Sequence, residues 1–391
     1  MAEGFIVRKG GVTSETTAAP TITIIEESTQ LIFTLKNNDD NTAIITYEID
    51  DILESIELAA DATSSNITID TLDSGEYTLT AYATVVGEVA TKSDEVVEII
   101  SLSEEFVLTG GNDTNVFKRN ATNGDAIWTF AGHTDRVTGA AIDDERNIYT
   151  CSRDNTVRKI DSDGNQVWVF TGHTDRVQGI SVDKNHVYSA AGNFSDFTVR
   201  KITKTGTQVW VFTGHTAIVQ DTAVDPNGNV YSVSRDNTVR KLNSNGNQVW
   251  SFTGHTNMVV RVDVDTNGFV YSASIDNTVR KINPNGTQVW SVNFGAVPNS
   301  VAVDKDFNVY AAVATQDRVT KLDSNGNAIW NVTNQPAAAV LSVGIEGNVY
   351  TGAGNQLAKL NGANGNEVWR ITIGTTNQFA SVYFPQTAPF I

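Results

Sequence analysis

The sequence has one cysteine, Cys151, in 391 residues, so no disulfide within the chain can stabilise the fold. No apolar run approaches the length of a membrane span. The first residues, MAEGFIVRKGG, lack the apolar core of a secretory signal peptide. We therefore expect neither membrane insertion nor ordinary secretion. A role outside the cell would require release by lysis or assembly into a particle.

Basic residues are also scarce: 27 Lys and Arg stand against 45 Asp and Glu, for a net charge of −18. Residues 1–105 hold 21 acidic and 4 basic side chains, which leaves 24 acidic and 23 basic for residues 106–391. The net charges are thus −17 and −1, which indicates two units with different surfaces. Neither unit has the basic footprint that nucleic-acid binding requires.

What the sequence does contain is a repeat marked by tryptophan. Seven tryptophans recur 39 to 42 residues apart, a period typical of propellers and solenoids. In residues 136–170, the segments RVTGAAID, NIYTCS, NTVRKID and NQVWVF are predicted as strands a, b, c and d. Asp-Gly or Asn-Gly pairs between strands c and d predict tight hairpin turns with positive φ. No segment shows a helical period.

The two ends of the repeat predict a closed ring. The first copy begins at Phe106 and lacks strand a, whereas the last copy is followed by FASVYF, residues 379–384. We expect this segment to supply strand a of the first blade, which leaves few exposed strand edges. The predicted fold class is all-β, with a seven-bladed β-propeller over residues 104–391.

The repeat resembles two propeller families. "GHTDRV…SRDNTVRK" is similar to the WD40 repeat, and "GNQVWVF" is similar to the repeat of quinoprotein (PQQ-type) propellers. The WD40 resemblance implies structural hydrogen bonds between a histidine and a turn aspartate within each blade. The tryptophan of WD40 strand c is absent, so the repeat is a hybrid. The implied structural pairs are His133 with Asp154, His173 with Asp196, His215 with Asp236, and His255 with Asp276.

We expect no metal, cofactor or catalytic centre. Equivalent histidines of a propeller lie far apart and cannot converge on one ion, and the Asp- and Gly-rich turns lack the full spacing of a calcium loop. The tryptophans are predicted to fill the core between blades. A basic residue recurs on strand c, and we interpret it as paired or lying along apolar surface rather than as a ring that grips a polyanion.

Binding residues are expected in the b–c loops at the rim of the propeller, because loops vary freely on a rigid framework. NFSD, residues 193–196, departs from the Ser-Arg-Asp form of the other loops. The candidate binding residues are Arg153, Asn193, Phe194, Asp196 and Arg235.

The first unit is predicted to contain a second β domain over residues 20–103. Segments such as QLIFTLKNND and AIITYEID alternate apolar and polar residues, as half-buried sandwich strands do. "LDSGEYTLTA" resembles the tyrosine corner of immunoglobulin-like (Ig-like) and fibronectin-like domains, with Tyr77 in the corner role. Residues 1–19 are predicted to form an extended leader with a possible strand at FIVRK.

The opening "GFIVRKGG", with its Thr-rich linker and Ig-like module, is similar to structural proteins of tailed phages of Gram-positive bacteria. The resemblance implies a non-enzymatic virion protein of a tail fibre, head fibre or appendage. Its leader would bind other virion proteins, and its propeller would bind a host-surface glycan or protein. The alternatives are a cellular WD40-like interaction scaffold and a glycan-active tail enzyme, which would need two carboxylates at a set separation.

Overall fold

A computed structural model describes seven strands between residues 21 and 102, and then residues 106–383 except 112–113, 122, 336–339 and 345–346. The chain divides into two compact units, Met1–Glu104 and Glu105–Ile391. The leader, with its possible strand at FIVRK, lies outside the described residues.

The first unit contains two antiparallel sheets, with strand orders β1-β2-β5 and β4-β3-β6-β7. The predicted segments 30–39 and 43–50 fall on β2 and β3. Tyr77 lies in β6, and its side chain is outside the described part. The strands are β1 (Thr21–Glu27), β2 (Gln30–Lys36), β3 (Ala43–Ile49), β4 (Ile52–Leu58), β5 (Ile67–Ile69), β6 (Gly75–Val85) and β7 (Val96–Leu102).

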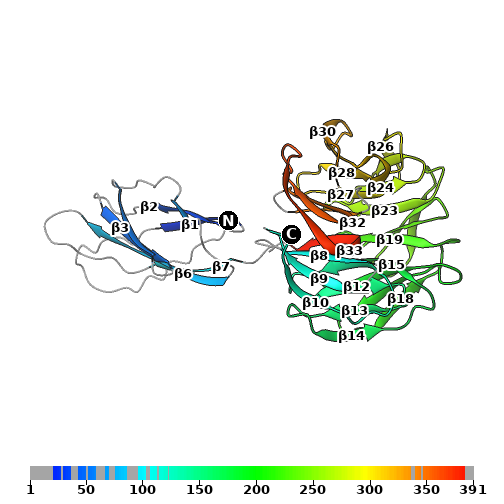
Figure 1. The fold of residues 1–391 in the computed structure, drawn as a ribbon, viewed down its shortest axis with the longest axis horizontal. Helices are drawn as coiled ribbons and strands as arrows, with labels where there is room; N and C mark the ends of the chain where they lie inside the picture. Colours follow the sequence, from blue (N-terminus) through cyan, green and yellow to red (C-terminus); the bar gives the residue numbers. More distant parts are fainter. Residues whose placement is uncertain are drawn as a thin grey trace. The chain divides into compact units, whose positions relative to one another are not determined.

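The second unit is a seven-bladed β-propeller, as the repeat predicts (Figure 1). Blades 2 to 6 are separate four-stranded antiparallel sheets whose strands follow chain order from a to d. The helix in the described part is a single 3-10 turn, Ala314–Gln316. The strands of blades 2, 3 and 4 are β11 (Val137–Ile142), β12 (Ile148–Ser152), β13 (Val157–Ile160), β14 (Gln166–Phe170), β15 (Val177–Val182), β16 (His186–Ala191), β17 (Val199–Thr203), β18 (Gln208–Phe212), β19 (Val219–Val224), β20 (Val230–Ser234), β21 (Val239–Leu242) and β22 (Gln248–Phe252). Those of blades 5 and 6 are β23 (Val259–Val264), β24 (Val270–Ser274), β25 (Thr278–Ile282), β26 (Gln288–Asn293), β27 (Ser300–Val303), β28 (Val309–Val313), β29 (Arg318–Leu322) and β30 (Ala328–Val332).

Blades 1 and 7 share one strand, which closes the ring. They form a six-stranded sheet in the order β10-β9-β8-β33-β32-β31. The first part of β33 pairs with β32, and its last part pairs with β8, from Phe379 opposite Gly110 to Tyr383 opposite Phe106. The predicted closing strand is confirmed, and residue 384 lies outside the described part. The strands are β8 (Phe106–Gly111), β9 (Val116–Asn120), β10 (Ala126–Phe130), β31 (Val340–Val343), β32 (Val349–Leu360) and β33 (Glu367–Tyr383).

The second strand of each blade forms the core. In β12, β20 and β24 every residue is buried, because neighbouring blades pack on both faces of the strand. A tyrosine is the largest fully buried side chain of this strand in six blades: Tyr149, Tyr188, Tyr231, Tyr271, Tyr310 and Tyr350.

Each tryptophan joins its blade to the next one. Trp210 Nε1 donates to the carbonyl of Ser244, in the c–d turn of the following blade, at 3.1 Å. All seven tryptophans make this bond, and Trp369 of blade 7 donates to Ala121 of blade 1 at 3.1 Å. The rings are half-buried, and in blades 2 to 7 each lies against the tyrosine of its own blade. The tryptophans therefore lie at the seams between blades and continue around the closed ring.

The c–d turns differ in one respect from the prediction. In the pairs Asp163-Gly164 and Asn245-Gly246, only the glycine has positive φ, at 91° and 83°. The Gly246 amide donates to the carbonyl of Asn243, and the pairing of β21 with β22 shifts register just after the turn. This is a type I turn followed by a left-handed glycine and a bulge, not a two-residue turn with two positive φ angles.

Candidate functional site

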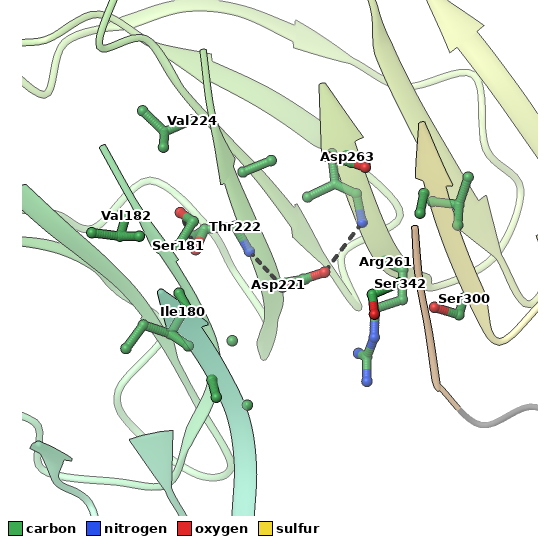
Figure 2. Close-up of a pocket in the computed structure, with 18 of the residues that line it drawn as sticks. Ile180, Ser181, Val182, Asp221, Thr222, Val224, Arg261, Asp263, Ser300 and Ser342 are labelled. Atoms are coloured by element: carbon green, nitrogen blue, oxygen red, sulfur yellow. Dashed lines mark hydrogen bonds between the residues drawn. The ribbon is translucent and has the colours of Figure 1, made fainter. Parts of the chain in front are cut away.

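The innermost strands of the blades line a central channel of about 440 Å³ (Figure 2). Its described walls come from β11, β15, β19, β23, β27 and β31. Small and aliphatic side chains dominate the lining of the channel. The charged side chains that β19 and β23 contribute to it are Asp221, Arg261 and Asp263. These three groups come from two adjacent blades.

The two channel carboxylates hold neighbouring strands together. Asp221 accepts a hydrogen bond from the Val262 amide at 3.3 Å, and Asp263 accepts one from Val303 at 2.9 Å. Burial raises the pKa of Asp221 to about 6, although the positive charge of Arg261 opposes the shift. Burial raises the pKa of Asp263 to about 7. Both carboxyls therefore titrate near neutral pH while they bridge consecutive blades.

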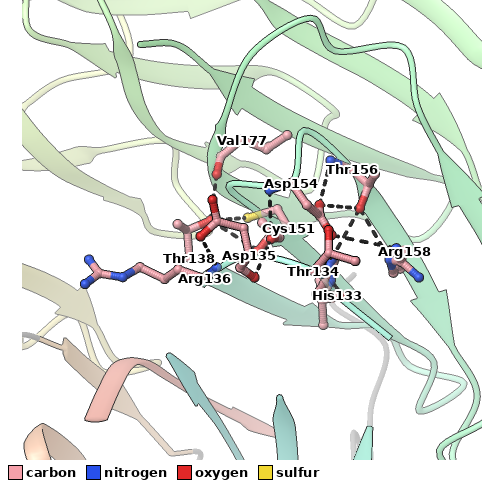
Figure 3. Close-up of polar contacts among 12 residues, drawn as sticks. His133, Thr134, Asp135, Arg136, Thr138, Cys151, Asp154, Thr156, Arg158 and Val177 are labelled. Carbon is pink, nitrogen blue, oxygen red and sulfur yellow. Dashed lines mark hydrogen bonds and ion pairs between the residues drawn. The ribbon is translucent and has the colours of Figure 1, made fainter. Parts of the chain in front are cut away.

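A histidine-centred network recurs in blades 2 to 5, and Figure 3 shows the network of blade 2. His133 Nδ1 lies 2.8 Å from Asp154 Oδ2, and His133 Nε2 lies 2.8 Å from the Thr150 hydroxyl. Asp154 also accepts from Thr156 at 2.6 Å and pairs with Arg158 at 3.7 Å. The same geometry holds for the other three expected pairs, His173 with Asp196, His215 with Asp236, and His255 with Asp276.

In the network of blade 4, the electrostatics keep the aspartate ionised and the histidine neutral. Burial opposes ionisation of Asp236, but hydrogen bonds from His215 and Thr238 hold the pKa of this carboxyl well below its usual range. Burial lowers the pKa of His215, despite the neighbouring carboxylate. His215 therefore donates through Nδ1 to Asp236 and accepts through Nε2 from Ser232.

The connectivity Ser232–His215–Asp236 is that of a catalytic triad, but its environment is different. Ser232 is fully buried, and the side chain of His215 has no exposed surface. A nucleophile must reach its substrate, and neither group can contact one in this packing. The fourfold recurrence of the network also matches a role in fixing the b–c turns.

The recurring basic residue of strand c is also used within the fold. Lys201 Nζ donates to the Ser244 carbonyl at 3.0 Å, the same atom that accepts from Trp210. It also lies 5.6 Å from the centre of the Tyr188 ring. Lys241, Lys281 and Lys321 make equivalent contacts with the next blade. These lysines therefore strengthen the seams between blades.

The rim of blades 2 to 4 carries a second set of basic residues. Because strands alternate in direction, the segment before strand a and the b–c turn lie at the same end of each blade. Two backbone hydrogen bonds show this pairing: Arg153 N donates to Arg136 O, and Gly192 N donates to Arg176 O, both at 2.9 Å. We call Arg136, Arg153, Arg176 and Arg235 the arginine rim.

The arginine rim differs from the strand-c arginines in its partners. Arg158, Arg200, Arg240 and Arg280 each pair with the aspartate of their own network. Within the described residues, Arg153, Arg176 and Arg235 form no ion pair, and Arg153 Nε is buried without a hydrogen-bond partner. Arg235 donates to Gln220 when the Gln220 amide is oriented with its oxygen toward the guanidinium.

The charges of the arginine rim act on one another. Burial, followed by the positive charges of Arg136, Arg176 and Arg235, lowers the pKa of Arg153. Asp135 offsets part of this repulsion. Arginine remains protonated at physiological pH, so three consecutive blades place positive charge together at one end.

The loop at residues 193–196 presents an aromatic side chain beside this charge. Phe194 is 84% exposed, and its amide is held by the Asp175 carboxylate, which also accepts from Ser195 at 3.3 Å. Asn193 is half-buried. Asp196 is 2% exposed and is bonded to His173, so we assign it to the network and not to the binding surface.

Sequence reasoning identified Arg153 and Arg235 but missed Arg136 and Arg176. The missed pair lies in HTDRV, which looks like an ordinary part of the repeat. The signal was the comparison between copies: blades 4 and 5 carry HTAIV and HTNMV instead. The Asp-Arg pair is therefore specific to blades 2 and 3.

The described residues contain no cluster of three or more His, Cys, Asp or Glu side chains placed to hold a metal ion. In the same part of the chain, no helix has the length and apolarity to cross a membrane.

Comparison with known families divides the propeller between two kinds of repeat. The model described as "WD domain, G-beta repeat" matches residues 124–161 and 164–201. The PQQ-type model described as "Outer membrane protein assembly factor BamB" matches residues 195–305 and 315–388. No curated protein matches the chain. The protein is therefore a propeller with both WD40-like and PQQ-like repeats, as the hybrid motif predicts.

Proposed function

We propose that this chain is a non-catalytic interaction scaffold whose propeller binds its target through the rim of blades 2 to 4. The observation that carries the proposal is the arginine rim beside Phe194. Most other recurring polar groups are bonded within the fold, whereas three of these guanidinium groups lack ion-pair partners in the described part. Exposed arginines and aromatic residues are also the side chains that dominate binding surfaces.

A cell-adsorption assay tests this proposal. Fluorescently labelled full-length chain is incubated with a panel of Gram-positive cells, and bound protein is measured by flow cytometry. Arg176→Gln combined with Arg235→Gln should reduce binding, because both side chains lie at the rim. Lys305→Gln removes one charge from an exposed pair with Asp306 in blade 6 and should have no effect. Equal binding by the rim variant and the wild type would contradict the proposal.

We propose further that the scaffold is assembled into a phage particle, with residues 1–19 as anchor and the first unit as an Ig-like or fibronectin-like spacer. The support is the resemblance of the GFIVRKGG segment and its Thr-rich linker to phage structural proteins. The two antiparallel sheets of the first unit are consistent with such a sandwich.

Mass spectrometry of gradient-purified particles tests the virion proposal, and antibody-gold electron microscopy then locates the protein on head or tail. Peptides that co-purify with particles are expected. Consistent absence would favour the alternative of a cellular scaffold, which the WD40-like repeats also support. Release of reducing ends from host polysaccharide by the full chain would instead indicate the glycan-active alternative.

A further inference from the structure

The fold brings the four residues of the arginine rim together from three consecutive blades. Arg136 and Arg153 belong to blade 2 and are joined by a backbone hydrogen bond of 2.9 Å. Arg176 precedes the first strand of blade 3, and Arg235 lies in the b–c turn of blade 4. Figure 3 shows the Arg136 side chain extending away from the His133–Asp154 network, whereas Arg158 lies beside that network.

The carboxylates next to the arginine rim accept hydrogen bonds from backbone amides. Asp135 accepts from the Arg136 amide at 2.6 Å, and Asp175 accepts from the amides of Arg176 and Phe194. Hydrogen bonds from the Phe194 and Arg176 amides outweigh burial and lower the pKa of Asp175, so it stays ionised and fixes the loop. Within the described residues, the guanidinium groups of Arg153, Arg176 and Arg235 have no carboxylate partner.

Resting on the proposed function, we propose that the arginine rim binds an anionic glycan, with its carboxylate or phosphate held by the guanidinium groups and a sugar ring packed on Phe194. A guanidinium presents a planar fork of donors that matches the two oxygens of a carboxylate or phosphate. The exposed Phe194 ring supplies the apolar surface on which the CH face of a sugar packs.

The charge distribution favours a glycan with spaced charges over a continuous polyanion. Residues 106–391 have a net charge of −1, so the propeller as a whole is not basic although four arginines gather at this rim. Screening limits the reach of exposed charges to about 8 Å at physiological ionic strength. A nucleic acid would extend well beyond the rim, and a propeller with almost no net charge lacks the broad basic footprint that such a ligand requires.

Calorimetric titration of the full chain with three polymers tests this inference. Hyaluronate carries carboxylate on alternate sugars, phosphomannan carries phosphate, and dextran is neutral. Binding is expected to hyaluronate or phosphomannan, to weaken as salt rises, and to be absent for dextran. The anionic polymer that binds distinguishes carboxylate from phosphate as the recognised group.

Variants then locate the site. Replacing Arg153 or Arg176 with Gln should weaken binding about tenfold to a hundredfold, the effect of losing a hydrogen bond to a charged group. Phe194→Ala should weaken binding less, and Lys305→Gln should leave it unchanged. Thermal unfolding followed by tryptophan fluorescence checks that each variant is folded, because all seven tryptophans lie in the propeller.

The inference is overturned if folded protein binds neither anionic polymer at low salt, or if binding survives removal of both Arg153 and Arg176. These results are separable from failure of the proposed function. If cell adsorption still depends on the rim, the scaffold role stands and the ligand is not an anionic glycan. If adsorption is independent of the rim, the proposed binding surface is wrong as well.

Discussion

In blades 1 to 6, each tryptophan ring lies against a turn glycine of the next blade. This contact predicts how much unfolding free energy is lost when a methyl group is added to that glycine. In Gly246→Ala, the new Cβ would lie 2.8 Å from Cδ2 and 3.1 Å from Cγ of Trp210. The backbone there has φ of +83°, a conformation that costs a non-glycine residue about 1–2 kcal/mol. Displacing the ring adds the cost of overpacking, about 1–3 kcal/mol. We therefore expect a loss of about 2–5 kcal/mol of unfolding free energy.

Gly228→Ala is the matched control in the same blade. Its φ is +75°, but an added Cβ would meet only Ser244 at 3.6 Å and Asp183 at 3.8 Å, which are ordinary contacts. This variant should show the backbone cost alone. The assay is denaturant unfolding of the full chain followed by tryptophan fluorescence, which reports on the propeller alone. Equal destabilisation by the two variants would refute the interpretation that the ring rests on the turn glycine.

Three further predictions concern the networks, the channel and the ring. Asp236→Asn should lower the unfolding free energy by about 3 kcal/mol at neutral pH, because it removes the carboxylate that accepts from His215 and Thr238 and pairs with Arg240. Since the pKa of Asp236 is lowered by folding, its contribution is present above about pH 4 and is lost as the pH falls further. The pKa of Asp263 is raised from 3.8 to about 7, so wild-type stability should fall as the pH rises through this range. In Asp263→Asn, the stability should depend less on pH over this range. Removal of residues 377–391 should abolish cooperative unfolding, because it leaves β8 unpaired on one side.

Each of these has a result that would contradict it. A difference between Asp236→Asn and wild type that stays constant from pH 7 to pH 3 would show that the carboxylate charge is not involved. Likewise, parallel pH profiles for wild type and Asp263→Asn would mean that this carboxyl does not titrate near neutrality. For the ring, removal of residues 384–391 alone is the control. Cooperative unfolding in both truncations would show that β33 does not close the propeller.

The fold was predictable because its signals are local and repeated. Several copies of the repeat show the same alternating strands, turn glycines and tryptophan spacing. An ambiguous signal in one copy is therefore resolved by the others. Closure was predictable from one missing strand at Phe106 and one extra strand near Phe379. The turn geometry was less accessible, because Asn-Gly is compatible with more than one turn type.

The candidate site was only partly predictable, because it depends on contacts between blades. The WD40 resemblance implies the pairing of His133 with Asp154, and both lie in one blade. It does not show that Arg176 of blade 3 acts on Arg153 of blade 2. Nor does it show that burial and neighbours in the channel move the pKa of Asp263. These properties arise from residues of adjacent blades, 23 positions apart for Arg153 and Arg176 and 40 for Asp263 and Val303, which meet only when the blades pack.

Hydrogen exchange of the full chain in the presence and absence of Gram-positive cell-wall fragments tests the central claim most directly. We predict slower exchange around residues 134–138, 174–178 and 192–196, and unchanged exchange in the c–d turns of blades 5 and 6. Protection confined to those c–d turns, or to the channel strands, would contradict the assignment of the binding surface to the rim of blades 2 to 4.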